Sequence, residues 1–309
     1  MKYTITSTNT LINLFTVLFL ISFNSSAQNV SEKAIVCNAA LDKGNFASAI
    51  IVSDEILQLE PNNRDGLLCK GRALGAQGKY DAALNALEMA AKHSKPGFEE
   101  IISYLIIGNL HKQNNKNAEA IASYEKSLKI SEIEKNDKFR LINHNLMGEA
   151  HTQNNDLNAA LASYLAGFKL TKNDNERADN FERLGITYSA LGQHDLAIEY
   201  QLKGMLMQQK SGTLDQYADA SLTLGKVYAN AKEYPQAEKT YTKLMQFAKD
   251  NGGAYYEAKA SYGLAQVTAA KGDSGKAKAI MSDALKIAKN IGDAGLATEI
   301  ETSIKKLPN

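Results

Sequence analysis

Three of the five histidines have a spacing that could serve metal binding. His144 and His151 lie seven residues apart, which places them on one face of a helix. His111 occupies the place of His151 one repeat earlier. Imidazole is a common zinc ligand, but equivalent positions on neighbouring helices are about 8–10 Å apart, too far for shared coordination. No HExxH motif or cysteine-rich spacing accompanies them. We therefore predict a structural role between helices, with a metal-dependent enzyme as the competing hypothesis.

The other chemistry-bearing residues form no catalytic pattern. No nucleophile elbow, phosphate-binding loop or dinucleotide-binding glycine pattern occurs in a strand–turn–helix setting. Carboxylates such as Glu99, Glu100, Glu132 and Glu134 are typical of a solvated helix surface. We expect no enzyme and no cofactor.

The elements that carry these residues form an internal repeat. The segment GKYDAAL at residues 78–84 recurs in variant form as GNFASAI (44–50), NKNAEAI (115–121), NDLNAAL (155–161), GQHDLAI (192–198), KEYPQAE (232–238) and GDSGKAK (272–278). Five residues after each turn begins stands an alanine: Ala49, Ala83, Ala120, Ala160, Ala197, Ala237 and Ala277. Seven residues before each turn stands a mostly small residue: Cys37, Gly71, Gly108, Gly148, Gly185, Gly225 and Ala265.

This spacing predicts pairs of antiparallel helices. One helix ends at the Gly or Asn of the turn, whose left-handed conformation satisfies the last carbonyl groups. A second helix then returns, and the small residues on both helices let the two backbones approach closely. One such pair cannot bury its apolar face alone, whereas stacked neighbours can.

The pattern resembles the tetratricopeptide repeat, which has a small residue at position 8, an aromatic residue at 11 or 17 and alanine at 20. The resemblance implies an all-α, right-handed superhelical solenoid of about seven helix pairs with a C-terminal capping helix. The chain departs from the family in having no tryptophan, and successive turns are 34, 37, 40, 37, 40 and 40 residues apart. This long period is similar to that of bacterial peptide-responsive regulators and of sensor regions ahead of kinases.

The predicted boundaries follow from this register. Residues 1–27 form a signal peptide, residues 28–292 the array and residues 293–309 the capping helix. The individual repeats are expected near 30–63, 64–97, 101–134, 141–174, 178–211, 218–251 and 258–291.

The resemblance also implies a concave groove lined by the first helix of each pair. Its central stripe, position 9, would hold Asn38, Arg72, Asn109, Glu149, Ile186, Lys226 and Gln266. Residues predicted to bind a protein or peptide partner in the middle of the array are Asn109, Lys112, Gln113, Glu149, Gln153 and Arg183. The alternative for each of them is an ordinary exposed polar residue. The family's two-carboxylate clamp is not matched here, so binding of chaperone tails is not expected.

The N-terminus predicts export. Lys2, an apolar run from Leu11 to Phe23 and the small residues before Gln28 have the layout of a signal peptide cleaved after Ala27. Its Ser-Ala-Gln ending resembles signal peptides of Bacteroidota-type bacteria. We expect a periplasmic or extracellular protein, with an uncleaved membrane anchor as the alternative.

Charge and cysteine content narrow the class of partner and the compartment. Removing Lys2 from the 35 basic residues leaves 34, which balances the 34 acidic residues. This balance argues against nucleic acid or an anionic membrane surface as the partner.

Cys37 and Cys69 could form a bridge in an oxidising compartment, but both lie on apolar faces of predicted helices. That placement favours two small, buried, unpaired residues. The chain is thus expected to be a secreted protein-binding scaffold, or alternatively a ligand-sensing module that regulates a separate effector.

Overall fold

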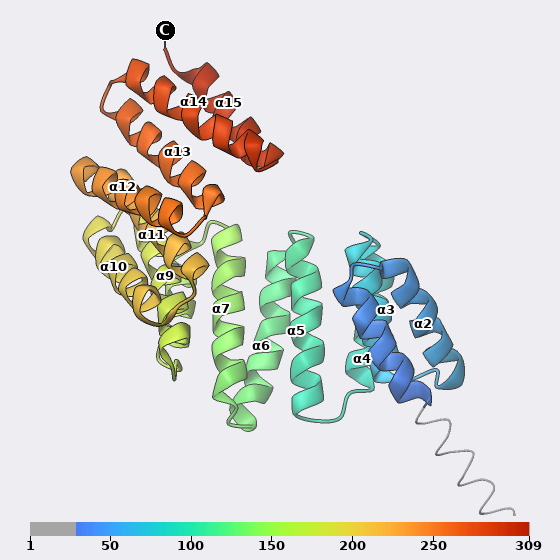
Figure 1. Ribbon diagram of the computed structural model, residues 1–309. Coiled ribbons are helices and arrows are strands. Elements are labelled where there is room, and N and C mark those ends of the chain that lie inside the picture. Colours follow the sequence, from blue (N-terminus) through green and yellow to red (C-terminus); the bar gives the residue numbers. More distant parts are fainter. Residues whose placement is uncertain (1–28, 309) are drawn as a thin grey trace, which may run out of the picture. The chain divides into compact units, whose positions relative to one another are not determined.

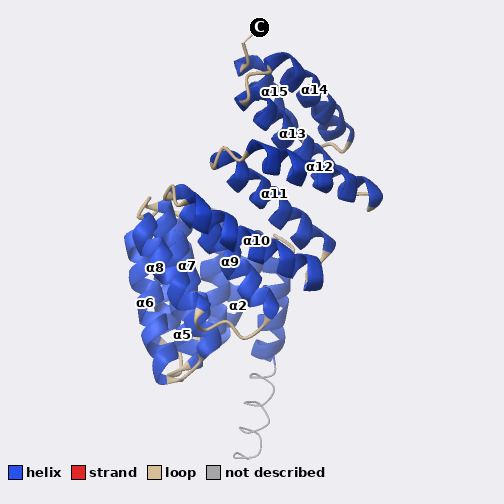
Figure 2. Ribbon diagram, turned by 90° about the vertical axis from the view of Figure 1, so that its left-hand side faces the viewer, coloured by secondary structure: helices blue, strands red, loops and turns tan. Residues whose placement is uncertain are grey.

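The computed structural model describes residues 29–308, and these residues form helices joined by short turns, with no strand among them (Figures 1 and 2). The predicted signal peptide and its cleavage site lie outside the described residues. A helix covers residues 29–42. The helices that follow it are α2 (Phe46–Leu59), α3 (Arg64–Ala76), α4 (Tyr80–Lys92), α5 (Phe98–Gln113), α6 (Asn117–Ile133), α7 (Asp137–Gln153), α8 (Leu157–Phe168), α9 (Asp174–Ala190), α10 (His194–Ser211), α11 (Leu214–Asn230), α12 (Tyr234–Asp250), α13 (Ala254–Ala270), α14 (Ser274–Asn290) and α15 (Ala294–Lys306).

The helices alternate as the repeat predicts. The first helices of the pairs are the helix over residues 29–42 and then the odd-numbered helices α3 to α13. The second helices are the even-numbered helices α2 to α14, and α15 packs against α14. The chain divides into two compact units at residues 146 and 147, within α7. The prediction of an all-α array of helix pairs is confirmed.

Each of the seven turns begins at a residue with left-handed backbone. These residues are Gly44, Gly78, Asn115, Asn155, Gly192, Lys232 and Gly272, with φ between 58° and 95°. At Gly192 the amide donates to Ser189 O (3.1 Å), and the next amide, of Gln193, donates to Tyr188 O (2.9 Å). These bonds satisfy carbonyl groups that the end of α9 leaves open, and glycine adopts the required φ without a steric penalty.

The seven repeated alanines are buried within the two units. All of them, Ala49, Ala83, Ala120, Ala160, Ala197, Ala237 and Ala277, have no exposed surface. A small side chain lets two helix backbones approach each other closely. Their predicted burial is confirmed, and at Ala83 the contact with the paired helix is direct, since a methyl group on Gly71 would lie 3.2 Å from Ala83 O.

The small residues of the first helices admit a large side chain from the second helix. A methyl group on Gly108 would lie 2.4 Å from Tyr124, one on Gly148 2.4 Å from Tyr164, and one on Gly225 2.6 Å from Tyr241. Each tyrosine ring therefore occupies the volume that a side chain on the first helix would need. This contact sets the spacing of the helices whose other faces carry the candidate binding residues.

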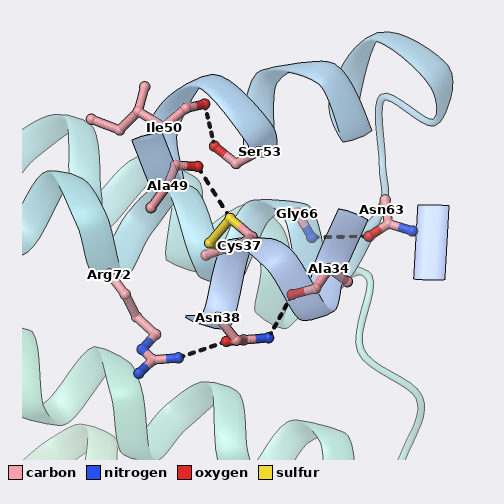
Figure 3. The surroundings of a disulfide bond; sticks show 10 residues. Ala34, Cys37, Asn38, Ala49, Ile50, Ser53, Asn63, Gly66 and Arg72 are labelled. Carbon is pink, nitrogen blue, oxygen red and sulfur yellow. Dashed lines mark hydrogen bonds between the residues drawn. A yellow bond between two sulfur atoms is a disulfide. The ribbon is translucent and has the colours of Figure 1, made fainter. Parts of the chain in front are cut away.

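A disulfide joins Cys37 and Cys69, whose Cα atoms are 6.3 Å apart (Figure 3). Both residues are buried, as predicted, but the prediction of two unpaired cysteines is wrong. Positions 8 and 6 of adjacent first helices lie close enough for the bridge, although 32 residues separate them in the chain. The sulfur of Cys37 also lies 3.1 Å from Ala49 O.

Candidate functional site

The first-helix face of the first unit contains a groove of about 310 Å³. It lies between the helix over residues 29–42, α3 and α5, and Phe46 of α2 and Leu87 of α4 also line it. Apolar side chains of Leu41, Phe46 and Ile106 line part of it, and Arg72 supplies the only charged group among its lining residues. An apolar wall with a few polar groups is the usual lining of a binding site.

Two of the predicted binding residues, Asn109 and Gln113, line this groove. The Tyr124 hydroxyl donates to Asn109 Oδ1 at 2.8 Å, which leaves the Asn109 amide to donate elsewhere. Gln113, the last residue of α5, is exposed, and Lys112 beside it is half-buried. Tyr124 thus reaches past Gly108 from α6 and orients a polar side chain of the groove.

The other three predicted residues belong to the second unit. Arg183 Nη1 of α9 donates to Glu149 Oε1 of α7 at 2.6 Å, so these two side chains form an ion pair with each other. The guanidinium also lies 5.8 Å from the centre of the Tyr164 ring. Burial lowers the pKa of Arg183, but the charge of Glu149 and the hydrogen bonds to Glu149 and Tyr164 outweigh it and leave that pKa raised. Gln153, at the end of α7, is exposed.

Carboxylates gather on the first-helix face of the second unit. Glu182 on α9 accepts from Thr223 Oγ1 at 3.3 Å, and Asp219 on α11 accepts from the Tyr256 hydroxyl at 3.2 Å. Burial raises the pKa of Glu182, and the charges of Asp179 and Asp219 raise it further, against the opposing hydrogen bond from Thr223. Burial likewise raises the pKa of Asp179. Burial is thus the main reason why these carboxyl groups are harder to ionise than exposed ones.

His111 lies between α4 and α5, and His144 is partly buried. Nδ1 of His111 is 2.8 Å from the Tyr80 hydroxyl, and burial lowers the His111 pKa. Burial also lowers the pKa of His144, with a further contribution from Arg140. Within residues 29–308, His, Cys, Asp and Glu side chains form no group of three that could hold a metal ion. None of the helices in that range combines the length and apolarity needed to cross a bilayer.

Comparison with known proteins agrees with this geometry. Models of the tetratricopeptide repeat match residues 101–133, 174–250 and 216–290. Over these residues the chain therefore carries tetratricopeptide repeats, within an all-α array of helix pairs. No curated protein sequence matches the chain significantly.

Solved structures share the fold at low sequence identity. The C-terminal part of a repeat-containing protein from Cytophaga hutchinsonii aligns over 86% of this chain and 98% of its own, with TM-score 0.60 and 16% identity. A tetratricopeptide repeat protein from Parabacteroides merdae aligns over 90% and 98%, with TM-score 0.60 and 15% identity. A signal-transduction ATPase with a tetratricopeptide repeat sensor, from Pyrococcus horikoshii, aligns over 82% of this chain and 40% of its own, with TM-score 0.64 and 15% identity.

Sequence reasoning placed Arg72 on the central stripe but not among the six binding residues, and it did not find the apolar wall. Leu41 and Phe46 flank the first turn and Ile106 lies on α5, so only the stacking of successive repeats brings them to one groove.

Proposed function

We propose that the protein is an exported scaffold that binds a partner protein by holding an extended segment on the first-helix face of its repeats. Tetratricopeptide repeats serve such binding in general, and this face combines apolar surface with amide and guanidinium groups. The close packing of alanines and glycines makes the face rigid. Little conformational entropy of the scaffold is then lost on binding.

The observation that carries the proposal is the groove of the first unit. It is open, has a mixed lining and includes two residues that the repeat register predicts as partner-binding, Asn109 and Gln113. No catalytic role is proposed for it, and the equal numbers of acidic and basic residues in the mature chain favour a protein over nucleic acid as the partner.

Two features support an oxidising compartment outside the cytoplasm. The N-terminal sequence has the layout of a signal peptide, and the bridge between Cys37 and Cys69 is of the kind that persists in periplasmic and extracellular proteins. Mass spectrometry of the exported protein should find Gln28 at the N-terminus. An intact Met1 on membrane-bound protein would support the anchored alternative.

A ligand-sensing module is the second candidate. Glu182 and Asp219 supply carboxylates to the first-helix face of the second unit that would accept hydrogen bonds from a peptide ligand, and the Pyrococcus horikoshii protein of similar fold has its repeats as a sensor. In this alternative the chain would regulate a separate effector protein.

Site-specific photo-crosslinking tests the scaffold proposal. A photoreactive phenylalanine analogue replaces Gln113 in the groove or, as a control, Lys129, which is exposed on the second helix α6. In envelope extract, position 113 should cross-link to a discrete partner protein and position 129 should not. Equal cross-linking at both positions, or none at 113 in a folded protein, would contradict binding on this face.

A further inference from the structure

Arg72 differs from every other arginine of the chain. The chain has five arginines, and the other four form ion pairs with carboxylates of the same chain. These pairs are Arg64 with Asp65, Arg140 with Asp137, Arg177 with Asp174 and Arg183 with Glu149. Arg72 is exposed, lines the groove of the first unit and pairs with no carboxylate among residues 29–308.

One donor of the Arg72 guanidinium is hydrogen-bonded within the chain, and most of its donors stay available. Its Nη1 donates to Asn38 Oδ1 at 3.0 Å, and Asn38 Nδ2 donates to Ala34 O at 3.0 Å (Figure 3). The disulfide lies next to this hydrogen-bonded pair, because Cys37 directly precedes Asn38 and Cys69 lies about one helical turn before Arg72. A guanidinium has five N–H donors in a planar fork, so the remaining edge suits the two oxygens of a carboxylate.

The surroundings of Arg72 specify more than the charge of the ligand. Leu41, Phe46 and Ile106 supply apolar surface in the same groove, and Asn109 supplies an amide. One cation in a partly apolar groove matches one carboxylate, whereas a phosphate group carries nearly two negative charges and three strong acceptor oxygens.

We propose that the groove of the first unit binds a partner segment in which an acidic side chain lies next to a large apolar side chain, with Arg72 binding the carboxylate. This rests on the proposed function and narrows the chemistry of the partner. The chain's own N-terminal segment cannot supply the group, because residues 1–28 contain no Asp or Glu.

Peptide selection tests the proposal. Random dodecapeptides displayed on phage are selected on the disulfide-bonded protein and then synthesised with both termini blocked. Their affinities are compared for wild type, Arg72→Gln, Arg72→Lys and the control Lys129→Gln, which removes one positive charge from the exposed surface of α6. Thermal melts verify that all variants fold.

The selected peptides should share Asp or Glu beside Leu, Ile, Phe or Met. Arg72→Gln should weaken binding at least tenfold, Arg72→Lys less, and Lys129→Gln by under twofold. Replacing the peptide's acidic residue by its amide should weaken wild-type binding equally, but should have little further effect on Arg72→Gln, because both changes remove one contact.

Other outcomes separate the two proposals. Peptides that bind Arg72→Gln as tightly as wild type, or that require a free C-terminal carboxylate, would overturn this inference and leave peptide binding intact. The absence of any saturable peptide would count against both proposals.

Discussion

Replacing Gly108 by alanine should destabilise the protein, although alanine is the better helix former. The added methyl group would lie 2.4 Å from Cε1, 2.6 Å from Cδ1 and 3.0 Å from Cζ of Tyr124. That ring is fully buried and its hydroxyl is bonded to Asn109. Overpacking costs ~1–3 kcal/mol, and loss of the hydrogen bond costs ~1 kcal/mol more. The helix-propensity gain of ~1 kcal/mol offsets only part of this, so the expected net loss is ~1–3 kcal/mol.

Gly275→Ala is the matched control. A methyl group there, in α14, would meet its nearest atom at 3.9 Å, so the helix-propensity gain of up to ~1 kcal/mol should appear without a steric cost. Urea denaturation followed by circular dichroism measures both variants, and hydrogen exchange of α5 and α6 shows whether the damage at Gly108 is local. A Gly108→Ala protein as stable as wild type would refute the close contact between α5 and Tyr124.

Three further perturbations test other parts of the structure. Ala237→Arg places a long charged side chain at a fully buried position and should cost at least ~3 kcal/mol of stability, seen as a broadened thermal melt. An unchanged melt would show that Ala237 is assigned to the wrong repeat position. Glu182→Gln should raise the melting temperature at pH 7, because the raised pKa of Glu182 means that ionisation destabilises the folded state. The increase in melting temperature should become smaller as the pH falls towards the ordinary glutamate pKa. An increase that does not depend on pH would contradict this explanation, and so would an equal increase in the control Glu125→Gln, where the glutamate is exposed. Replacing Cys37 and Cys69 together by alanine should cost up to ~4 kcal/mol in denaturation, from loop-closure entropy; no loss would indicate that the bridge does not constrain the unfolded chain.

The helix pairs could be predicted from sequence because their causes are local and repeated. A left-handed residue at each turn, an alanine five residues later and a small residue seven residues earlier determine where paired helices cross. The pattern does not predict every contact between paired helices. Gln201 stands where other repeats have Tyr124, Tyr164 or Tyr241, and its Nε2 donates to Glu182 O at 2.7 Å.

The disulfide and the pairing of polar residues depend on distances between repeats. Cys37 and Cys69 occupy different repeat positions, and only the stacking of first helices brings their Cα atoms to 6.3 Å. Similarly, Glu149 at position 9 and Arg183 at position 6 of the next repeat are 34 residues apart in the chain, and the sequence does not show that the two side chains form an ion pair with each other. The six predicted partner-binding residues therefore remain a prediction, with Asn109 and Gln113 placed in a groove and Glu149 and Arg183 paired.

The most direct measurement of the central claim is a calorimetric titration of the cross-linked partner, once purified, into wild type and an Asn109→Ala/Gln113→Ala double variant. Both residues line the groove, so binding should weaken at least tenfold, or about 1.4 kcal/mol. Lys129→Ala, on the exposed surface of α6, should bind as wild type does. Equal affinities of the folded double variant and wild type would contradict binding through the first-helix face of the first unit.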